Sequence, residues 1–450
     1  MVGTNLTEGS ILKKLLIFAA PIVLTNLIQQ MYSTVDLMVV GKFVGGVGTV
    51  GVSTGGELSD ITTPIANAFA TAGQIYIAQL TGAKETEKRR DAMITLITIM
   101  LCFSVAFTAL PLFFHSVLLR LLNCPREALS EATVYMVTTA IGMPFIFGYS
   151  GVCAVLRGMG ESKRPLLFVS ISASVNVIMD LALVAVFHMG VFGAAIATVI
   201  TQVSAFLAAY VFLNRHKEQM GVALRLSTLH IDLHALRVIF RLGIPQIIRS
   251  ISVHFAMLWV KANVNSYGML VSTTYSVGNK VEKLMNVFVQ GVDSAAGAMI
   301  GQNLGARQIN RVKRVYLTTL CCTMVCGTLV AILFLGIPKT LFRLFTEEPD
   351  VVEYGVVFLR IMAVGSIVGA FSGAFRSIAT GAGEEKLCLI IGLGDATCRI
   401  AICMIFDDIL KWGSTSYFWG AALCQLIPGL IALSYFISGK WKTKKLMAER

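Results

Sequence analysis

Charged residues are scarce in this sequence. Only 14% of the 450 residues are Asp, Glu, Lys or Arg, whereas 56% are hydrophobic. Soluble domains carry roughly 25% charged residues, because a surface in water needs polar cover. A soluble chain of this composition would expose large apolar patches and aggregate. We therefore expect the chain to lie in a lipid bilayer, where an apolar outer surface is stable.

The sequence also lacks the usual signatures of catalysis and of metal binding. It contains no Walker A, HExxH or GxSxG pattern, and its six histidines do not cluster. None of the ten cysteines forms a CxxC pair, and several lie inside apolar runs. Residues 46–51 match GxGxxG by letters, but we expect them in a loop after an apolar helix. We expect no enzymatic activity, no disulfide framework, no metal site and no cofactor.

Apolar runs take the place of the missing polar stretches and recur about a dozen times. A helix needs about 20 residues to cross the hydrocarbon core, and runs this long do not alternate as barrel strands must. The sequence predicts an all-α polytopic membrane protein with about twelve transmembrane helices. The expected spans are 15–39, 58–81, 92–115, 132–155, 166–188, 191–213, 238–262, 272–300, 315–337, 353–379, 387–410 and 416–437.

The net charge of +12 is carried mainly by the loops. Lys and Arg gather at 84–90, 163–164, 307–314 and 440–445, which the expected spans place on one side of the membrane. Such clusters are typical of cytoplasmic loops and do not indicate a nucleic-acid partner. We expect a monomer in the cell membrane, surrounded by lipid, with both termini in the cytoplasm.

The two halves of the chain resemble each other in sequence. Residues 78–84 read AQLTGAK and residues 301–307 read GQNLGAR, at an offset of 223. GMGESK at 158–163 and GAGEEK at 381–386 have the same offset. Membrane composition alone would repeat apolar letters, not loops of Gly, Ala and a basic residue in register. The sequence therefore predicts an internal repeat.

The repeat predicts two lobes of six helices each. We expect one lobe at 1–213, a cytoplasmic linker at 214–237 and a second lobe at 238–450. With six spans each, both lobes start on the same side, so a pseudo-two-fold axis along the membrane normal relates them. A cleft between such lobes can open to either side by rocking, as in secondary transporters.

Two acids within the expected spans are the most informative residues. A charge near the bilayer centre costs at least about 2.5–3.5 kcal/mol. Asp36 has Tyr32 one turn before it, and Asp180 has Asn176 one turn before it. Each acid could simply cap or pair near an interface. If Asp36 and Asp180 face one cavity, burial and mutual repulsion disfavour ionisation, so the pair would take up a proton and release a bound cation.

The second half carries a different, largely basic polar set. One interpretation is mutual neutralisation with snorkelling toward the membrane faces. The sharper hypothesis is that Asp293 and Glu282 pair with Arg249 or Lys261 and line a cavity. The candidates for lining a substrate cavity are Asn26, Gln30, Arg249, Lys261, Asp293 and Arg399.

Several segments together resemble the MATE family, the multidrug and toxic compound extrusion antiporters. The strongest are PIVLTNLIQQMYSTVDLMVVG, AQLTGAK, LRGMGESKRP, NVIMD with GVFGAAIATVITQ, and GQNLGAR. The resemblance covers roughly residues 11–440. It implies twelve helices in two six-helix bundles and exchange of H⁺ or Na⁺ for organic cations.

The sequence looks most like the DinF-like branch of that family. The resemblance implies a cation-coupling site in the first lobe, made by Asp36, Tyr32, Asn176, Asp180, Thr198 and Tyr135. The NorM-like branch has additional acids on helices seven and ten, whereas here residues 238–262 and the stretch from Phe358 to Thr380 contain none.

We expect a multidrug antiporter that exports amphipathic organic cations in exchange for H⁺ or Na⁺. The basic second lobe leaves one alternative, a related exporter or flippase of an anionic, zwitterionic or lipid-linked substrate. A membrane enzyme would need a catalytic His or Ser constellation, which the sequence does not offer.

Overall fold

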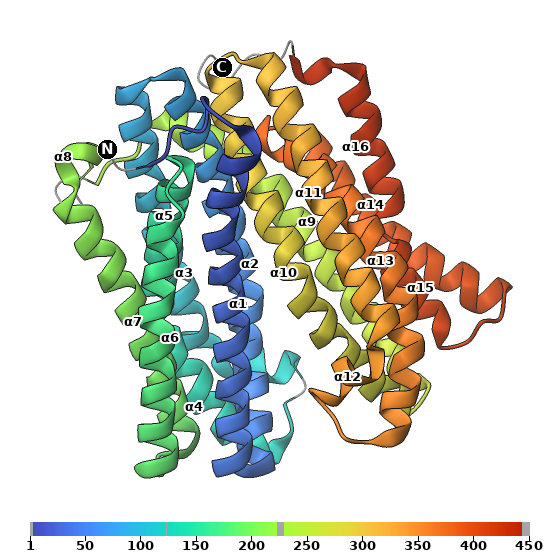
Figure 1. Cartoon of the computed structure of the whole chain (residues 1–450). Coiled ribbons are helices and arrows are strands. Elements are labelled where there is room, and N and C mark those ends of the chain that lie inside the picture. Colours follow the sequence, from blue (N-terminus) through green and yellow to red (C-terminus); the bar gives the residue numbers. More distant parts are fainter. Residues whose placement is uncertain (1–2, 123, 223–228, 443–450) are drawn as a thin grey trace. The chain divides into compact units, whose positions relative to one another are not determined.

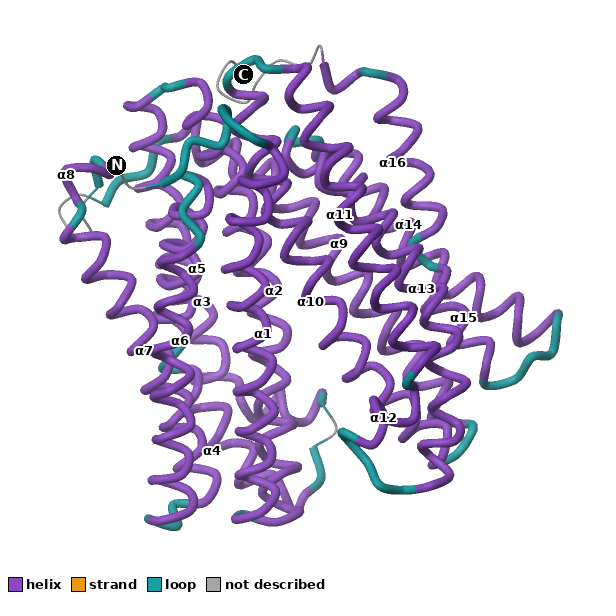
Figure 2. The backbone as a smooth tube through the Cα atoms, viewed as in Figure 1, coloured by secondary structure: helices purple, strands orange, loops and turns teal. Residues whose placement is uncertain are grey.

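The computed structural model describes residues 3–122, 124–222 and 229–442 (Figure 1). Nearly all of these residues lie in helices, and none of them forms a strand (Figure 2). The helices of the first half are α1 (Ile11–Phe43), α2 (Gly45–Ala83), α3 (Thr86–Leu121), α4 (Leu129–Ala140), α5 (Met143–Gly158), α6 (Lys163–Asp180), α7 (Gly190–Arg215) and α8 (Lys217–Met220). Those of the second half are α9 (Leu233–Ser266), α10 (Met269–Gly305), α11 (Ile309–Gly336), α12 (Pro338–Arg343), α13 (Pro349–Gly381), α14 (Glu385–Met404), α15 (Thr415–Leu423) and α16 (Leu426–Ser438).

The predicted all-α polytopic architecture is confirmed. Among the described residues, eight helices are long and apolar enough to cross a membrane, or nine if the bent pair α4 and α5 forms one span. The remaining expected spans lie within α2, α9 and α10, which are 39, 34 and 37 residues long but richer in polar residues. Every expected span therefore lies, to within two residues at its end, in a helix or in two consecutive helices.

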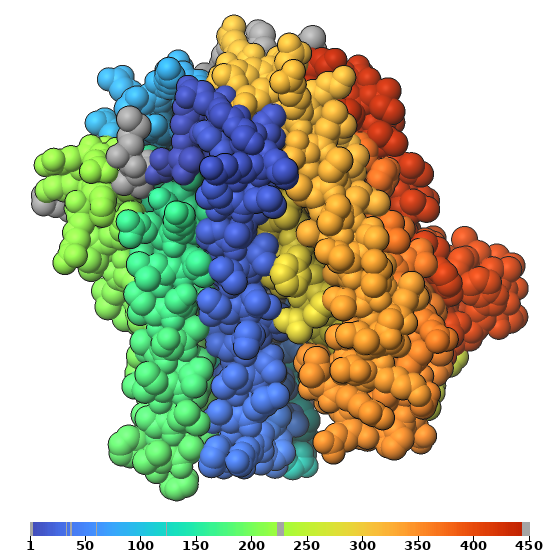
Figure 3. Space-filling view, in the orientation of Figure 1, coloured from blue at the N-terminus to red at the C-terminus, as the bar shows by residue number. Residues whose placement is uncertain are grey.

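The outer faces of the helices are apolar. On α11, Val325, Leu329 and Ile332 are 59%, 57% and 58% exposed, and the side chains of this amber-coloured helix lie at the surface in Figure 3. These residues are spaced three or four apart, so they form one stripe along the helix. In water such a stripe would be unfavourable, whereas lipid tails cover it without cost.

The expectation of a loop at residues 46–51 is wrong, because α2 begins at Gly45. The glycines there allow two helices to approach closely. A Cβ added to Gly51 would lie 2.6 Å from Cβ of Glu131, and one added to Gly55 would lie 2.8 Å from the carbonyl oxygen of Ala132. Small residues at such spacing favour close helix packing in membranes. Here they bring α2 against α4, next to Tyr135.

The contacts divide the chain into two compact units. Unit 1 comprises Met1–Asn5 and Leu24–Gly243, and unit 2 comprises Leu6–Val23 and Ile244–Arg450. Helices α1 and α9 each run from one unit into the other. The predicted lobe boundaries at 213 and 238 stay predictions, since this division follows them only in part.

Each unit is completed by part of a helix from the other half of the sequence. In unit 2, Leu15, Phe18 and Ile22 of α1 belong to an apolar core with residues of α10, α11, α13 and α14. In unit 1, Phe240 of α9 packs against Phe69 and Phe103, with ring centroids 5.2 and 5.9 Å away. The predicted linker 214–237 thus contains α8 and the start of α9, and its residues 223–228 lie outside the described part of the chain.

Candidate functional site

Asp180 is the last residue of α6 and is fully buried in unit 1. It is 0% exposed, and neither of its carboxylate oxygens has a hydrogen-bond partner among the described residues. Asn176, one turn earlier, is 2% exposed, and its Oδ1 is also covered and without a partner. A π-helical segment, Leu181–Val186, follows directly. Such segments are rare and often occur at functional sites.

Asp36 lies on α1, in the part of that helix that belongs to unit 1. The residue is half-buried, and its Oδ1 is covered and has no hydrogen-bond partner among the residues described. Asp36 interacts electrostatically with Asp180 and with Tyr32, which lies one turn before it on the same helix. The structure therefore brings the two acids predicted from the sequence close to each other.

Tyr135 and Thr198 lie near the same level of unit 1. Tyr135 is 7% exposed and belongs to an apolar cluster with Val40, Val184 and Ala194. Val40 lies one turn after Asp36, and Val184 lies one turn after Asp180. Ala194 lies one turn before Thr198. The Thr198 hydroxyl donates to the carbonyl of Ala194 at 3.0 Å, which leaves its oxygen lone pairs available as acceptors.

The central part of this site consists of acceptors without donors. Asp36, Asn176 and Asp180 together place four oxygen atoms in covered positions with no hydrogen-bond partner in the described structure. An unsatisfied buried acceptor costs about 1–3 kcal/mol, and more if it is charged. A proton or a small cation removes that cost, because each supplies the positive charge that the oxygens lack. The arrangement is thus suited to reversible cation binding.

Gln202 is a polar residue near Thr198 that was not predicted from the sequence. Gln202 lies one turn after Thr198 on α7, and its Oε1 is covered and without a partner among the described residues. The i, i+4 spacing within an apolar run was the signal that could have identified it. The cavity candidates Asn26 and Gln30 are half-buried on α1. The helical period puts them on a different face from Tyr32 and Asp36.

Unit 2 contains ion pairs within its helical core. Arg376 of α13 donates to Oδ2 of Asp293 on α10, from Nη2 at 2.9 Å and from Nε at 3.3 Å. Arg399 of α14 donates to Oδ1 of Asp395, one turn earlier, at 3.3 Å. Neither Arg376 nor Asp395 was among the residues predicted from the sequence to line a cavity. The i, i+4 spacing of Asp395 and Arg399 could have revealed the second pair.

The hypothesis that Asp293 and Glu282 pair with Arg249 or Lys261 is wrong as stated. Asp293 pairs with Arg376, and Glu282 accepts a hydrogen bond from the amide of Asn286 at 3.0 Å. Lys261 is exposed. Arg249 interacts electrostatically with Asp293 but forms no ion pair with it. The roles of the four cavity candidates in this half stay predictions.

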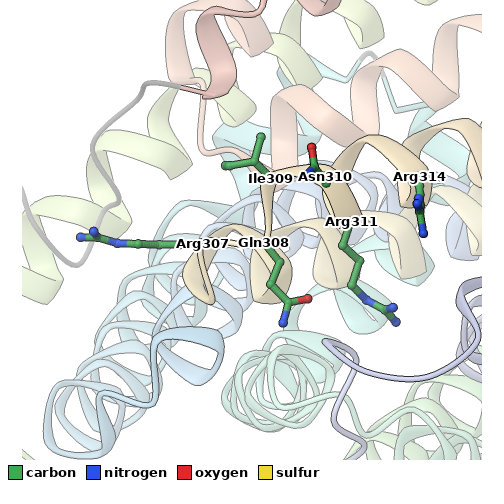
Figure 4. Close-up of a pocket in the computed structure, with 6 residues that line it drawn as sticks. All are labelled: Arg307, Gln308, Ile309, Asn310, Arg311 and Arg314. Carbon is green, nitrogen blue, oxygen red and sulfur yellow. The ribbon is translucent and has the colours of Figure 1, made fainter.

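A basic pocket of about 440 Å³ lies where α10 ends and α11 begins (Figure 4). It is lined by Arg307, Gln308, Ile309, Asn310, Arg311 and Arg314. Nη2 of Arg311 donates to the carbonyl of Glu8 at 2.8 Å, and Arg307 extends away from the other two arginines in Figure 4. None of the candidate site residues lines this pocket. Its arginines belong to the basic loop cluster at 307–314, which is typical of a cytoplasmic loop.

The same family model matches the chain twice, once in each half. The MatE family model covers residues 21–182 and 245–405. The chain belongs to the MATE family. The second match begins at Pro245, 224 residues after Pro21, so the predicted repeat is confirmed as a repeat of this domain.

Relatives of this chain carry names that refer to multidrug resistance or multidrug export. The probable multidrug resistance protein YpnP of Bacillus subtilis is 26% identical over 453 residues, with 100% of both chains covered. The multidrug export protein MepA of Staphylococcus aureus strain MSSA476 is 21% identical, over 95% of this chain and 93% of its own. A crystal structure of MATE in complex with MaD3S matches the fold with a TM-score of 0.92 at 19% identity, covering 99% of this chain and 100% of the other.

Membership of the MATE family confirms the predicted twelve-helix, two-bundle fold and the class of membrane transporters. It does not test the DinF-like branch, the coupling ion or the charge of the cargo. The residue assignments also stay predictions, although the geometry gathers Asp36, Asp180, Asn176 and Tyr32 in one region of unit 1.

Proposed function

We propose that this MATE protein exports amphipathic organic cations in exchange for H⁺ or Na⁺ by alternating access. The observation that carries the proposal is the set of four covered, unpartnered oxygens of Asp36, Asn176 and Asp180. No bond is made or broken, so the protein acts as a transporter and needs no resident cofactor. It acts as a monomer in the cell membrane, with both termini in the cytoplasm.

The coupling follows from competition for one negative site. Two nearby carboxylates repel each other and are poorly solvated, so binding of one proton or one Na⁺ is favourable. A cationic cargo is attracted to the unoccupied, negatively charged site. When the coupling ion binds from the outside, it cancels that attraction and the cargo leaves. The inward gradient of the ion thereby drives export.

The other candidate residues support the acid pair. The Tyr32 hydroxyl and the Thr198 oxygen lie on helices next to the acids and supply polar groups to a bound ion or its water. Tyr135 and its apolar neighbours limit water access at that level of unit 1. A dry surrounding strengthens each electrostatic interaction at the carboxylates.

The test is dye efflux from proteoliposomes with an imposed gradient of either H⁺ or Na⁺. We expect one of the two gradients to drive efflux of a cationic dye by the wild-type protein. Asp36→Asn should lose that efflux while it remains folded, as judged by size-exclusion chromatography and thermal unfolding. Glu87→Gln is the matched control, because Glu87 is an exposed acid of the same unit and should leave efflux unchanged. Undiminished, gradient-driven efflux by Asp36→Asn would exclude the proposed coupling site.

A further inference from the structure

The basic pocket at the start of α11 has no part in the proposed export. Its volume is about 440 Å³, and it lies where α10 ends (Figure 4). Three of its lining residues are arginines, Arg307, Arg311 and Arg314, and none of those in the described structure is acidic. Small-molecule sites have volumes of roughly 300–1,000 Å³. The pocket is therefore large enough for an anionic group.

Two of these arginines lack partners for part or all of their guanidinium group. Arg311 and Arg314 lie one turn apart on α11 and interact electrostatically, and like charges at this spacing repel each other. Nη2 of Arg311 donates to the carbonyl of Glu8, but its Nε is covered and has no hydrogen-bond partner among the described residues. Arg314 is exposed, and its side chain forms neither a hydrogen bond nor an ion pair within the described chain.

One acid lies close to this pair of cations. Glu8 interacts electrostatically with Arg311. It does not line the pocket, and the described structure contains no ion pair between Glu8 and either arginine. A single carboxylate can neutralise at most one of two guanidinium groups. At least one positive charge therefore remains at the pocket, even if Arg307 is left out of the count.

The equivalent corner of the first repeat, between α2 and α3, contains its own acids. At the offset of 223 residues, Gln308 and Arg314 correspond to Glu85 and Asp91. Glu85 forms an ion pair with Lys88 at 3.9 Å, and Asp91 forms one with the arginine before it at 3.7 Å. Residues 84–91 include four basic and three acidic residues, whereas 307–314 include four basic residues and no acid. A net basic loop is enough to orient a helix, so orientation alone does not require the complete absence of acids in the second repeat.

An apolar stripe on α11 leads away from the pocket. Leu317 lies three residues after Arg314 and is 45% exposed. Val325, Leu329 and Ile332 are exposed further along the helix. The helical period puts these residues on the face of α11 that carries Arg314. Lipid tails cover such a stripe in a membrane, so the Arg314 guanidinium lies at the level where the chains of a lipid give way to its headgroup.

We propose that the basic pocket binds the phosphate group of an anionic phospholipid, with Arg311 and Arg314 as the main donors and the lipid chains along the α11 stripe. A guanidinium matches phosphate oxygens through two parallel hydrogen bonds. Gln308 precedes α11 without a side-chain capping bond, so the first amides of the helix can add donors to the same group. The bound lipid holds this corner of unit 2 at one leaflet. The inference goes beyond the export function and does not rest on it.

Native mass spectrometry of the purified full-length protein tests the site without requiring transport. The probes are phosphatidylglycerol and phosphatidylcholine with identical acyl chains, which differ only in the headgroup and its net charge. The ratio of lipid-bound to lipid-free protein gives the relative affinity for the first lipid. We expect the wild type to bind phosphatidylglycerol several-fold more tightly, because basic pockets favour anionic headgroups.

The variants assign that preference to Arg314. Arg314→Gln should weaken binding of phosphatidylglycerol about tenfold and leave that of phosphatidylcholine within about twofold, because it removes a charge-assisted, two-bond contact. Arg314→Lys keeps the charge but loses the parallel bonds, so its effect should be intermediate. Arg314→Asp introduces the residue of the first repeat and should abolish the preference. Lys313→Gln is the matched control, because Lys313 is an exposed neighbour that does not line the pocket.

Equal losses for Arg314→Gln and Lys313→Gln would mean that the charge of the loop, and not the pocket, attracts the lipid, and would overturn the site. A wild type without the preference, or unchanged phosphatidylglycerol binding by Arg314→Gln, would overturn it as well. Thermal unfolding checks that each variant is folded. If Arg314→Gln does not fold, Arg314→Lys decides, and unchanged phosphatidylglycerol binding by it overturns the site.

Glycerol 3-phosphate separates a lipid from a soluble ligand. It carries the phosphate group without acyl chains, so the α11 stripe adds nothing to its binding. We expect it to displace phosphatidylglycerol only at a far higher concentration than that of the lipid. Displacement at an equal concentration would assign the pocket to a soluble phosphate compound and overturn the lipid as its ligand. Asp36→Asn should keep the lipid preference, so this site and the proposed coupling can fail separately.

Discussion

The two repeats place opposite polar chemistry on equivalent helices. In the first repeat, α6 carries Asn176 and Asp180 and is followed by a π-helical segment. In the second, α14 carries Arg399 and Cys403 at the matching positions and is followed by the π-helical segment Ile405–Ile409. Unit 1 thus has covered oxygen acceptors without donors, whereas unit 2 has arginines paired with acids, Arg376 with Asp293 and Arg399 with Asp395.

The two repeats share the features that determine the fold, but they differ in the buried polar side chains that determine ligand binding. Apolar periodicity and close-packing glycines determine where helices begin and which faces meet. A few buried polar side chains determine which ligand each unit stabilises, and they can change without changing the fold.

The largest effect is expected from neutralising the buried acid of unit 1. Asp180→Asn keeps the shape of the side chain but removes the charge. We expect gradient-driven efflux to fall to the rate of vesicles without protein. Because Asp180 is fully buried with no partner for either oxygen in the described structure, removal of its charge should leave the melting temperature unchanged or higher. Efflux assays and thermal unfolding in detergent measure the two effects.

A combined loss of efflux and of stability would contradict this prediction. It would mean that the Asp180 carboxylate has a structural partner that outweighs its desolvation. Glu161→Gln is a useful contrast, because Glu161 accepts hydrogen bonds from the amides of Lys163 and Arg164 at the start of α6. That variant should lose some stability and keep efflux.

The next largest effect concerns the ion pair of unit 2. Arg376→Gln leaves the buried carboxylate of Asp293 without its partner, which should cost about 3–5 kcal/mol of unfolding free energy. The double variant with Asp293→Asn should recover part of that loss, because both charges are then gone. Equilibrium unfolding in detergent of the wild type, both single variants and the double variant gives the coupling energy. Additive losses would show that the two side chains do not stabilise each other.

The sequence predicted the helices well, because hydropathy and length carry that information. The long apolar run of α3 and the i, i+4 relation of Asn176 and Asp180 are both visible without a structure. The glycine-rich start of α2 was misread as a loop. Glycine signals a loop only where no helix packs closely, and here Gly51 and Gly55 face α4.

The partners of the buried charges could not be predicted in the same way. Arg376 and Asp293 are separated by 83 residues and lie on different helices. Hydropathy does not say which helix faces meet, so the choice of Arg249 or Lys261 for Asp293 had no geometric basis. The π-helical segment after Asp180 was also not visible, since no Pro or Gly interrupts residues 181–186.

A smaller effect is expected from adding a methyl group at Gly392, against which the Arg249 side chain packs. A Cβ at Gly392 would meet Cγ of Arg249 at 1.9 Å, so Gly392→Ala should displace the guanidinium. We expect a loss of about 1–3 kcal/mol of unfolding free energy from overpacking. Equilibrium unfolding in detergent measures the loss.

Gly394→Ala on the same helix is the matched control for that variant. The nearest atom to an added Cβ there is Cγ of Pro428, at an ordinary 3.4 Å. It should keep the unfolding free energy of the wild type within about 0.5 kcal/mol. Equal behaviour of the two glycine variants would mean that the position of Arg249 does not depend on α14.

The smallest expected effect is a difference in unfolding free energy between variants at the N-termini of the equivalent helices α9 and α1. Asp232 caps α9, since its Oδ1 accepts from the amide of Ala235 at 2.7 Å, and its own amide donates to Oγ1 of Thr95 in unit 1 at 3.0 Å. Asp232→Ala should therefore cost about 1 kcal/mol of unfolding free energy. Ser10 precedes α1 without a side-chain hydrogen bond in the described structure, so Ser10→Ala should cost almost nothing. Equilibrium unfolding in detergent compares them. Equal losses would mean that the cap of α9 does not help to hold the first turns of that helix in unit 1.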